Sequence, residues 1–304
     1  MTTTLITGPT RGLGRATALA LAGRTDLLLV GRGGTALTEV ADAARARGSR
    51  VHAIACDLSR LADVRAAAAT ARDLLAGEPL RALIANAGLM PADTRAVSAD
   101  GYELTFAVNH LAHAQLIDDL LDTMTQGAMT QGAITQGSRI VLLGSNTYRA
   151  NFWRRLLRVP EAQWRDPVEL ARPTGGTEPG GVAYSNAKLA ILYYAHELQR
   201  HAGARVGVAV FEPGWMPGTA LSRDAPPALQ AIGRGLSRLP GVATPERSGP
   251  QLASMALDDR WAGLRDGAFV VRDRLAQVWP VAHDRAREQR LWAATAELLK
   301  AARR

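Results

Sequence analysis

Two side chains capable of acid–base chemistry lie four positions apart in the run Tyr184-Ser-Asn-Ala-Lys188. On a helix, this spacing places both on one face. A tyrosine with an ordinary pKa of about 10 exchanges protons poorly at neutral pH, whereas a neighbouring ammonium stabilises the phenolate and lowers that pKa. Lys188 and Lys300 are the only lysines among 36 basic residues. A lysine kept in so arginine-rich a chain predicts a role for a compact ammonium group.

Three glycines follow the first apolar run, in Thr7-Gly8-Pro9-Thr10-Arg11-Gly12-Leu13-Gly14. They separate a strand expected at 3–7 from a helix expected at about 13–24. Glycines let the backbone approach a pyrophosphate, and the first N–H groups of a helix favour its charge, although turns also use glycine for their own geometry. We expect phosphate contacts from Gly8, Thr10, Arg11, Gly12, Leu13 and Gly14. Pro9 lacks an N–H, so amides further along must hold the phosphate.

The end of the second expected strand, at 26–30, indicates which dinucleotide binds. An acidic residue there would bond the adenosine ribose and repel a 2′-phosphate. The chain instead reads Val30-Gly31-Arg32-Gly33, with no acid until Glu39. Arg32 and Arg11 can clamp a 2′-phosphate from two sides, which predicts NADP(H) rather than NAD(H). The alternative is that Arg32 is an ordinary exposed arginine.

The elements that must position these residues alternate along the chain. Short apolar runs predict strands, and Ala/Leu-rich stretches predict helices between them. Further strands are expected at 50–56, 80–85, 139–143, 205–211 and 268–271, and helices at 35–47, 60–76, 99–124, 183–201, from 245 onward and at 284–302. This order predicts the α/β class, with a doubly wound, Rossmann-like parallel sheet covered by helices on both faces. We expect a single domain over residues 1–304.

Three segments interrupt the alternation. A repeat of Thr-Gln-Gly-Ala at 125–138 is expected to form a surface loop. The insertion at 146–181 and the Gly/Pro-rich segment at 213–245 are expected to form the substrate region. Four large side chains in them either line a pocket for a bulky apolar molecule or only pack the extra segments down: Trp153, Trp164, Trp215 and Met216. The basic run at 152–158 is expected to be a solvated face, with a membrane surface or an acidic partner as the alternative.

Composition excludes several classes of protein. The 304 residues are 47% apolar and 21% charged, which argues against disorder. No apolar run approaches the roughly 18 residues that cross a bilayer. The start of the chain lacks a signal-peptide pattern, and Cys56 is the only cysteine, so we expect a cytoplasmic protein without a disulfide or a metal site. The net charge of +8 suggests nucleic-acid binding as a hypothesis. The arginines, however, form no basic stripe among stacking aromatic residues, which argues against it.

The order of these motifs resembles that of the short-chain dehydrogenase/reductase family, over residues 3–219. The glycine turn is similar to the family pattern TGxxxGxG, and Tyr184 with Lys188 to its YxxxK pair. The resemblance implies a catalytic set of Asn109, Ser145, Tyr184 and Lys188. It also implies cofactor contacts from Asp57 and Leu58 to the adenine, from Asn86, Ala87 and Gly88, from Tyr184 and Lys188, and from Pro213, Gly214 and Thr219 to the nicotinamide.

The family's chemistry assigns a role to each member of this set. Ser145 would orient a substrate oxygen, Tyr184 would exchange its proton, and Lys188 would bond the nicotinamide ribose. Asn109 would bend the long helix and hold a water that links Lys188 to solvent. His110 and His113 are expected to be packing or surface residues rather than bases.

The implied function is hydride transfer between NADP(H) and a ketone or aldehyde, with its alcohol, on a bulky and largely apolar small molecule. The run at 100–113 resembles the branch of retinol dehydrogenase-like and protochlorophyllide reductase-like enzymes, which also lengthen the stretch between Ser145 and Tyr184. The alternative is an NADP(H)-binding regulatory or scaffold protein without turnover, which the loss of Tyr184, Lys188 or Ser145 would have favoured. Whether the chain forms a homo-oligomer is left open.

Overall fold

The computed structural model describes residues 1–91, 93–130, 137–149, 160–216 and 242–303. All strands of the described chain lie in one eight-stranded sheet with the order β3-β2-β1-β4-β5-β6-β7-β8. The strands are β1 (Thr3–Thr7), β2 (Asp26–Gly31), β3 (Val51–Ala55), β4 (Leu80–Ala85), β5 (Ser138–Leu143), β6 (Val206–Glu212), β7 (Ala268–Val271) and β8 (Arg274–Ala276). Neighbouring strands are parallel except β8, which pairs antiparallel with β7.

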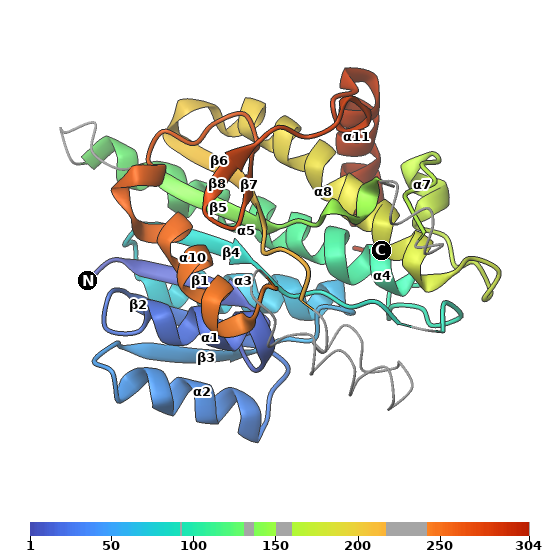
Figure 1. Ribbon diagram of the computed structural model, residues 1–304. Coiled ribbons are helices and arrows are strands. Elements are labelled where there is room, and N and C mark those ends of the chain that lie inside the picture. Colours follow the sequence, from blue (N-terminus) through green and yellow to red (C-terminus); the bar gives the residue numbers. More distant parts are fainter. Residues whose placement is uncertain (92, 131–136, 150–159, 217–241, 304) are drawn as a thin grey trace.

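Helices cover both faces of the sheet (Figure 1). The longer ones are α1 (Gly12–Leu21), α2 (Thr35–Arg45), α3 (Leu61–Leu75), α5 (Ala112–Thr130), α8 (Gly180–Ala202), α10 (Pro245–Leu257) and α11 (Arg285–Ala301). The short ones are α4 (Leu104–Phe106), α7 (Pro167–Leu170), the π turn η1 (Ala107–Leu111), and the 3₁₀ turns η2 (Asn146–Tyr148), η3 (Gly203–Arg205), η5 (Asp259–Trp261) and η6 (Pro280–Ala282).

Two hydrophobic clusters fill the space between sheet and helices. One packs α1, α2 and α10 against one face of the sheet, and the other packs α3, α5 and α8 against the opposite face. Because both faces are covered, all six residues of β2 are buried, as in other parallel sheets. This arrangement confirms the predicted α/β, doubly wound class.

The structure corrects three expectations about element bounds. The long helix begins at Leu104 rather than at 99, because Gly101 adopts a positive φ in a turn and the Glu103 side chain then caps the helix, accepting from the Thr105 and Phe106 amides. The repeat was expected to be a loop, yet α5 continues through its first copy to Thr130. Strand β8 was not predicted, since three residues carry too little periodicity.

Candidate active site

The carboxyl ends of the central parallel strands meet at one edge of the sheet. From β1 the chain adds strands outward on one side, β2 and then β3, and afterwards on the other side, beginning with β4. The crevice between β1 and β4 is therefore the topological switch point, where sheets of this kind bind ligands. The glycine turn follows β1, Asn86 follows β4, Ser145 follows β5 and Pro213 follows β6. The sheet therefore gathers residues that are far apart in the sequence and were predicted as one site.

The glycine turn has the backbone shape that a phosphate cradle needs. Gly8 has a φ of +66°, and a Cβ added to Gly14 would lie 2.1 Å from the Gly8 carbonyl oxygen, so a larger residue cannot replace either glycine without strain. Gly12 has a φ of +51° and nothing within 4 Å of an added Cβ, so the first turn of α1 faces open space. The residues present thus fit a dinucleotide phosphate at the start of this helix.

Asn86 and Ala87 tie the end of β4 to the glycine turn. The Asn86 amide nitrogen Nδ2 donates to the Thr7 carbonyl at 2.9 Å and to the Gly8 carbonyl at 3.3 Å. The backbone N–H groups of Asn86 and Ala87 both donate to Thr7 Oγ1, each at 3.0 Å. The neighbouring Gly88 is exposed. These hydrogen bonds hold the glycine turn against the end of β4, while Gly88 remains accessible.

The adenosine end of the site is formed by three segments in contact. A Cβ added to Gly31 would lie 3.4 Å from Pro9 and 3.9 Å from Thr10, so the segment before Arg32 touches the glycine turn. Arg11 and Arg32 are both exposed. Beside them, the Cys56 amide donates to the Gly31 carbonyl.

The carboxylate expected to reach the adenine is engaged within its own turn. Asp57 accepts from the amide and hydroxyl of Ser59 at 3.0 and 2.8 Å, while Leu58 packs against the hydrophobic cluster. The structure therefore places Asp57 and Leu58 at this end of the sheet but gives Asp57 a local partner.

Asn109 lies in the π turn η1, so the predicted disturbance of the long helix is present. Its side chain makes two hydrogen bonds with one residue, accepting from the Leu89 amide and donating to the Leu89 carbonyl, each at 2.9 Å. Asn109 is buried. Its side chain thus holds the segment after Gly88.

Ser145, Tyr184 and Lys188 come together as their spacing predicts. The Ser145 side chain hydrogen-bonds Tyr184, and the Lys188 Nζ lies 5.4 Å from the centroid of the Tyr184 ring. Lys188 is buried and donates to the Leu143 carbonyl at 2.6 Å. Burial lowers the pKa of Lys188 to about 7.

The expected lowering of the Tyr184 pKa by Lys188 is not found among the protein's own groups. Burial raises the pKa of Tyr184, the nearby Glu212 carboxylate raises it further, and the Ser145 hydrogen bond opposes them. Lys188 points at the Leu143 carbonyl rather than at the phenol oxygen, which explains the difference.

Glu212, at the end of β6 directly before Pro213, is the residue that sequence reasoning missed. It is buried, and it accepts hydrogen bonds from the Gly214 amide and the Asn146 side chain. Burial raises its pKa. The only sequence signal was an acidic residue between an apolar strand and a Pro-Gly pair, which carries no periodicity.

Other predicted site residues lie elsewhere or are not described. Pro213 accepts from Ser248 and Gly214 has a φ of +90°, whereas Thr219 lies outside the described residues. Trp153 and the basic run at 152–158 also lie outside them. Trp164 packs edge-on against Tyr193, with ring centroids 4.8 Å apart, and Met216 packs against the cluster beneath α10. Trp164 and Met216 thus make packing contacts, while Trp215 is 63% exposed.

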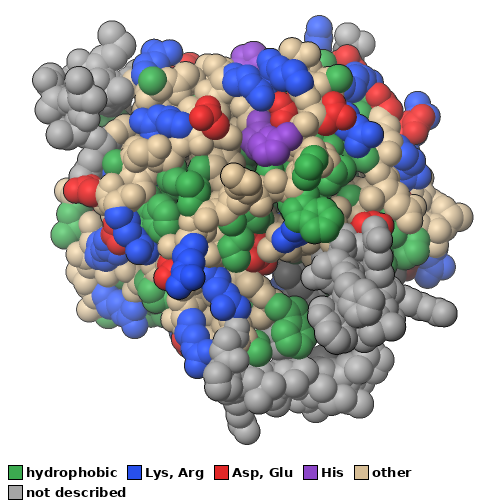
Figure 2. Space-filling model, turned by 45° about the horizontal axis from the view of Figure 1, so that its top comes forward, with side chains coloured by type: hydrophobic (Ala, Val, Ile, Leu, Met, Phe, Trp, Pro, Cys, Tyr) green, Lys and Arg blue, Asp and Glu red, His purple; other side chains and the backbone are tan. Residues whose placement is uncertain are grey.

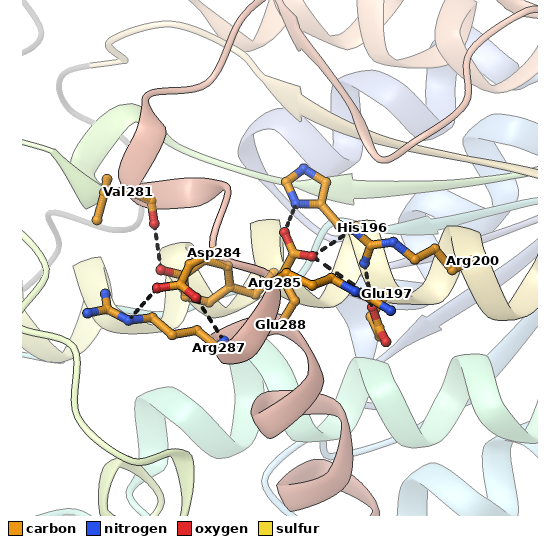
Figure 3. Close-up of polar contacts among 9 residues, drawn as sticks. His196, Glu197, Arg200, Val281, Asp284, Arg285, Arg287 and Glu288 are labelled. Carbon is orange, nitrogen blue, oxygen red and sulfur yellow. Dashed lines mark hydrogen bonds and ion pairs between the residues drawn. The ribbon is translucent and has the colours of Figure 1, made fainter.

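A second polar cluster joins the C-terminal half of α8 to the start of α11 (Figure 3). Glu288 Oε1 lies 2.8 Å from His196 Nδ1, and its Oε2 lies 2.7 Å from Arg200 Nη2. Glu197 forms ion pairs with Arg200 and Arg285. We call these five residues the α8–α11 clasp. Figure 2 shows histidines among basic and acidic side chains on the outer face of the molecule.

The clasp and the neighbouring His283 carry side chains of the metal-ligand type, but the clasp has the charges of an ion-pair network. One ligand atom each of His196, His283 and Glu288 lies within 4.8 Å of the others. The Glu288 carboxylate, however, already holds His196 and Arg200, and Arg285 lies 3.8 Å away. Two guanidinium groups at this carboxylate oppose a further cation. We therefore interpret the cluster as a link between helices.

A doubly wound parallel sheet with this glycine turn and these polar residues defines the class of Rossmann-like oxidoreductases that bind a nicotinamide dinucleotide. The family profile described as short chain dehydrogenase matches residues 2–148. Polyprenol dehydrogenase of Mus musculus is 32% identical over 298 residues, covering 95% of this chain and 81% of that protein. The chain belongs to the short-chain dehydrogenase/reductase family, and the resemblance noted from its motifs is confirmed.

Two further comparisons agree with this assignment. Human retinol dehydrogenase 13 is 29% identical over 307 residues, covering 98% of this chain and 84% of that protein, and protochlorophyllide reductases are also among the relatives. A blue fluorescent protein from a metagenomic library, solved in complex with NADPH, shares the fold with a TM-score of 0.62 and 23% identity, over 90% of this chain and 96% of that one. Among the described helices, none is both long and apolar enough to cross a membrane.

Proposed function

We propose that the protein is an NADP(H)-dependent reductase and dehydrogenase that interconverts a ketone or aldehyde and its alcohol. The observation that carries this proposal is the group of Ser145 with the buried Tyr184 and Lys188 at the carboxyl edge of the central strands. A regulatory protein would have no need to bury an ammonium group 5.4 Å from the centre of a buried tyrosine ring. We further propose that residues 1–304 form one domain. A cytoplasmic location stays a prediction from sequence.

In the proposed mechanism the cofactor, when bound, supplies or accepts a hydride. The glycine turn and the start of α1 would hold its pyrophosphate, and Lys188 would hold the nicotinamide ribose. Ser145 would donate to the substrate oxygen and orient it toward the Tyr184 hydroxyl. Tyr184 would give its proton to that oxygen during reduction.

Protein groups alone keep Tyr184 protonated, because burial and Glu212 both raise its pKa. That state suits a proton donor in the reductive direction. In the oxidative direction Tyr184 must accept a proton, and the positive charge of an oxidised nicotinamide would favour its anion. The Asn109 carbonyl in the π turn would carry the water that returns protons from solvent to Lys188.

The choice of NADP(H) rests on Arg11 and Arg32. The two exposed guanidinium groups stand on segments in contact, at the place where an acid would select NAD(H). Arginine matches the fork geometry of a phosphate. We expect Arg32→Ala to weaken NADPH binding while leaving NADH binding unchanged. Equal losses for the two cofactors would contradict the clamp.

For the substrate we propose a bulky, largely apolar carbonyl or alcohol. Two relatives are named for the alcohols polyprenol and retinol, and both are apolar molecules. The lengthened stretch between Ser145 and Tyr184, shared with that branch, supports a large pocket.

The proposal is tested by NADPH oxidation with a panel of isoprenoid, aromatic and steroidal carbonyls, comparing the wild type with Tyr184→Phe. We expect turnover by the wild type and a loss of about 100-fold or more in the variant, whose NADPH affinity should be kept. Equal rates in the two proteins would overturn the mechanism. NADPH binding without turnover of any carbonyl would favour the regulatory alternative.

A further inference from the structure

His113, at the start of α5 beside the π turn, makes a hydrogen bond through each ring nitrogen. Its Nε2 lies 3.0 Å from Thr7 Oγ1, and its Nδ1 lies 3.3 Å from the Asn109 carbonyl oxygen. The side chain is buried, with 4% of the residue exposed. It therefore links β1, which begins the glycine turn, to the backbone of a residue in the predicted catalytic set.

The partners of Thr7 decide which nitrogen carries the proton. Two backbone N–H groups, those of Asn86 and Ala87, donate to Thr7 Oγ1 at 3.0 Å each. A hydroxyl oxygen has two lone pairs and one hydrogen. With both lone pairs taken, the Thr7 hydroxyl must donate to His113 Nε2. The proton of the neutral ring is then on Nδ1, which donates to the Asn109 carbonyl.

The same count of lone pairs on the Thr7 hydroxyl oxygen keeps the His113 ring neutral. A second proton would sit on Nε2 and point at the Thr7 oxygen, whose lone pairs are already engaged. Burial lowers the pKa of His113 to about 4; the hydrogen bond with the Asn109 carbonyl opposes this shift, and the charge of Lys188 adds to it. His110 is also buried, and burial lowers its pKa to about 3, but its Nε2 bonds the Thr295 hydroxyl rather than a residue of the glycine turn.

We propose that His113 is a positioning residue for proton transfer, whose Nδ1–H holds the Asn109 carbonyl in the orientation that the path to Lys188 requires. This role rests on the proposed function. A π turn widens the helix and weakens its regular hydrogen bonds, so a carbonyl within it needs another restraint. The Asn109 side chain is held by Leu89, and His113 holds the other side of the same residue.

Two substitutions separate this role from simple packing. Asparagine places an amide nitrogen near the position of Nδ1, so His113→Asn keeps a donor for Asn109 and loses the Thr7 contact. Glutamine reaches the position of Nε2, so His113→Gln keeps the Thr7 contact and loses that donor. Both shorten a buried ring, and His110→Asn is the matched control for that cost.

We expect His113→Gln to lower kcat about tenfold with KM nearly unchanged, and to increase the solvent deuterium isotope effect on kcat. His113→Asn and His110→Asn should stay within about twofold of the wild type in kcat and keep its isotope effect. An equal loss of kcat in both His113 variants, with no change in isotope effect, would overturn the proposal, because packing alone would then explain it.

The tautomer has a test that needs no turnover. In ¹⁵N NMR spectra of the full chain at neutral pH, His113 should show a protonated Nδ1 and an unprotonated Nε2. The opposite tautomer, or an imidazolium, would overturn the proposal even in an active enzyme. A wild type that turns over no carbonyl, yet shows the expected tautomer, would overturn the proposed function and this role with it, while the hydrogen-bond assignment would stand.

Discussion

Helix α8 carries two buried polar regions of opposite design. In its N-terminal half, Lys188 is buried against a carbonyl, and no carboxylate among the described residues forms an ion pair with it. At its C-terminal half, the carboxylates of Glu197 and of Glu288 from α11 are just as buried but are matched by Arg200 and by Arg285 from α11. One region therefore holds a buried amine without a counter-ion among the described residues, and in the other the buried carboxylates have ion-pair partners.

We interpret this difference as the one between a residue that takes part in the proposed reaction and residues that connect two helices. A buried charge without a counter-ion costs free energy of folding, and chains keep it where its reactivity is used. A buried carboxylate with two guanidinium partners is satisfied and mainly connects the helices. The comparison predicts that substitutions in the two halves of α8 will affect activity and stability in opposite ways.

The largest effect is expected at Lys188. Lys188→Met keeps the side-chain length and removes the ammonium, so kcat/KM for carbonyl reduction should fall by about 100-fold or more. The free energy of unfolding should not fall, because a buried charge without an ion pair has been removed. Steady-state kinetics and urea unfolding would measure both quantities. A stable variant with wild-type activity would break the comparison on its catalytic side.

The opposite pattern is expected in the clasp. Glu288→Gln leaves Arg200 and Arg285 with Glu197 alone and should lower the free energy of unfolding by about 2 kcal/mol, while kcat per folded molecule is kept. Asp42→Asn, which breaks an exposed ion pair with Arg45, is the control and should cost below about 0.5 kcal/mol. A loss at Glu288 no larger than at Asp42 would show that the clasp does not stabilise the fold.

The pH dependence of stability should also distinguish Lys188. Its pKa is about 7 in the folded chain and 10.5 in an exposed lysine, so the folded chain binds fewer protons than the unfolded chain between these values. The free energy of unfolding contributed by this group therefore rises as pH increases from 7 toward 10.5, and is constant below 7. Urea unfolding of the wild type and Lys188→Met should show the wild type gaining relative stability across that window. Parallel curves would mean that Lys188 titrates normally.

A smaller effect is expected from Glu212. Its carboxylate raises the pKa of Tyr184, so Glu212→Gln should lower that pKa. The alkaline limb of kcat/KM for reduction should then move to lower pH, because Tyr184 loses its proton earlier. Pre-steady-state pH profiles of both proteins would measure the shift. Glu297→Gln, at an exposed site, should leave the limb in place, and an identical limb in the Glu212 variant would remove Glu212 from the electrostatics of the site.

Much of the fold and most positions of the candidate site follow from the sequence. Apolar runs of strand length predicted seven of the eight strands, since a parallel sheet buries both faces and leaves a continuous signal, as in β2. The glycine turn and Tyr184 with Lys188 were located because their spacing is local.

The rest depends on contacts that local patterns do not contain. The direction of the Lys188 side chain toward Leu143 is set by packing between α8 and β5, and the place of Glu212 beside Tyr184 by sheet order. Helix α5 enters the first copy of the repeat because its one glycine costs only about 1 kcal/mol in a helix, while Gln, Ala and Met favour a helix. The tautomer of His113 follows from two amides that are distant in sequence.

The three-residue strand β8 changes how this sheet can meet another chain. Because β8 runs antiparallel along β7, it occupies the backbone donors and acceptors that β7 would otherwise present. The outermost backbone on that side then belongs to a very short strand that begins with an exposed arginine. Short edges with charged side chains resist the backbone pairing that leads to aggregation. Of the two borders of the sheet, this one is the less available for continuous strand pairing between molecules.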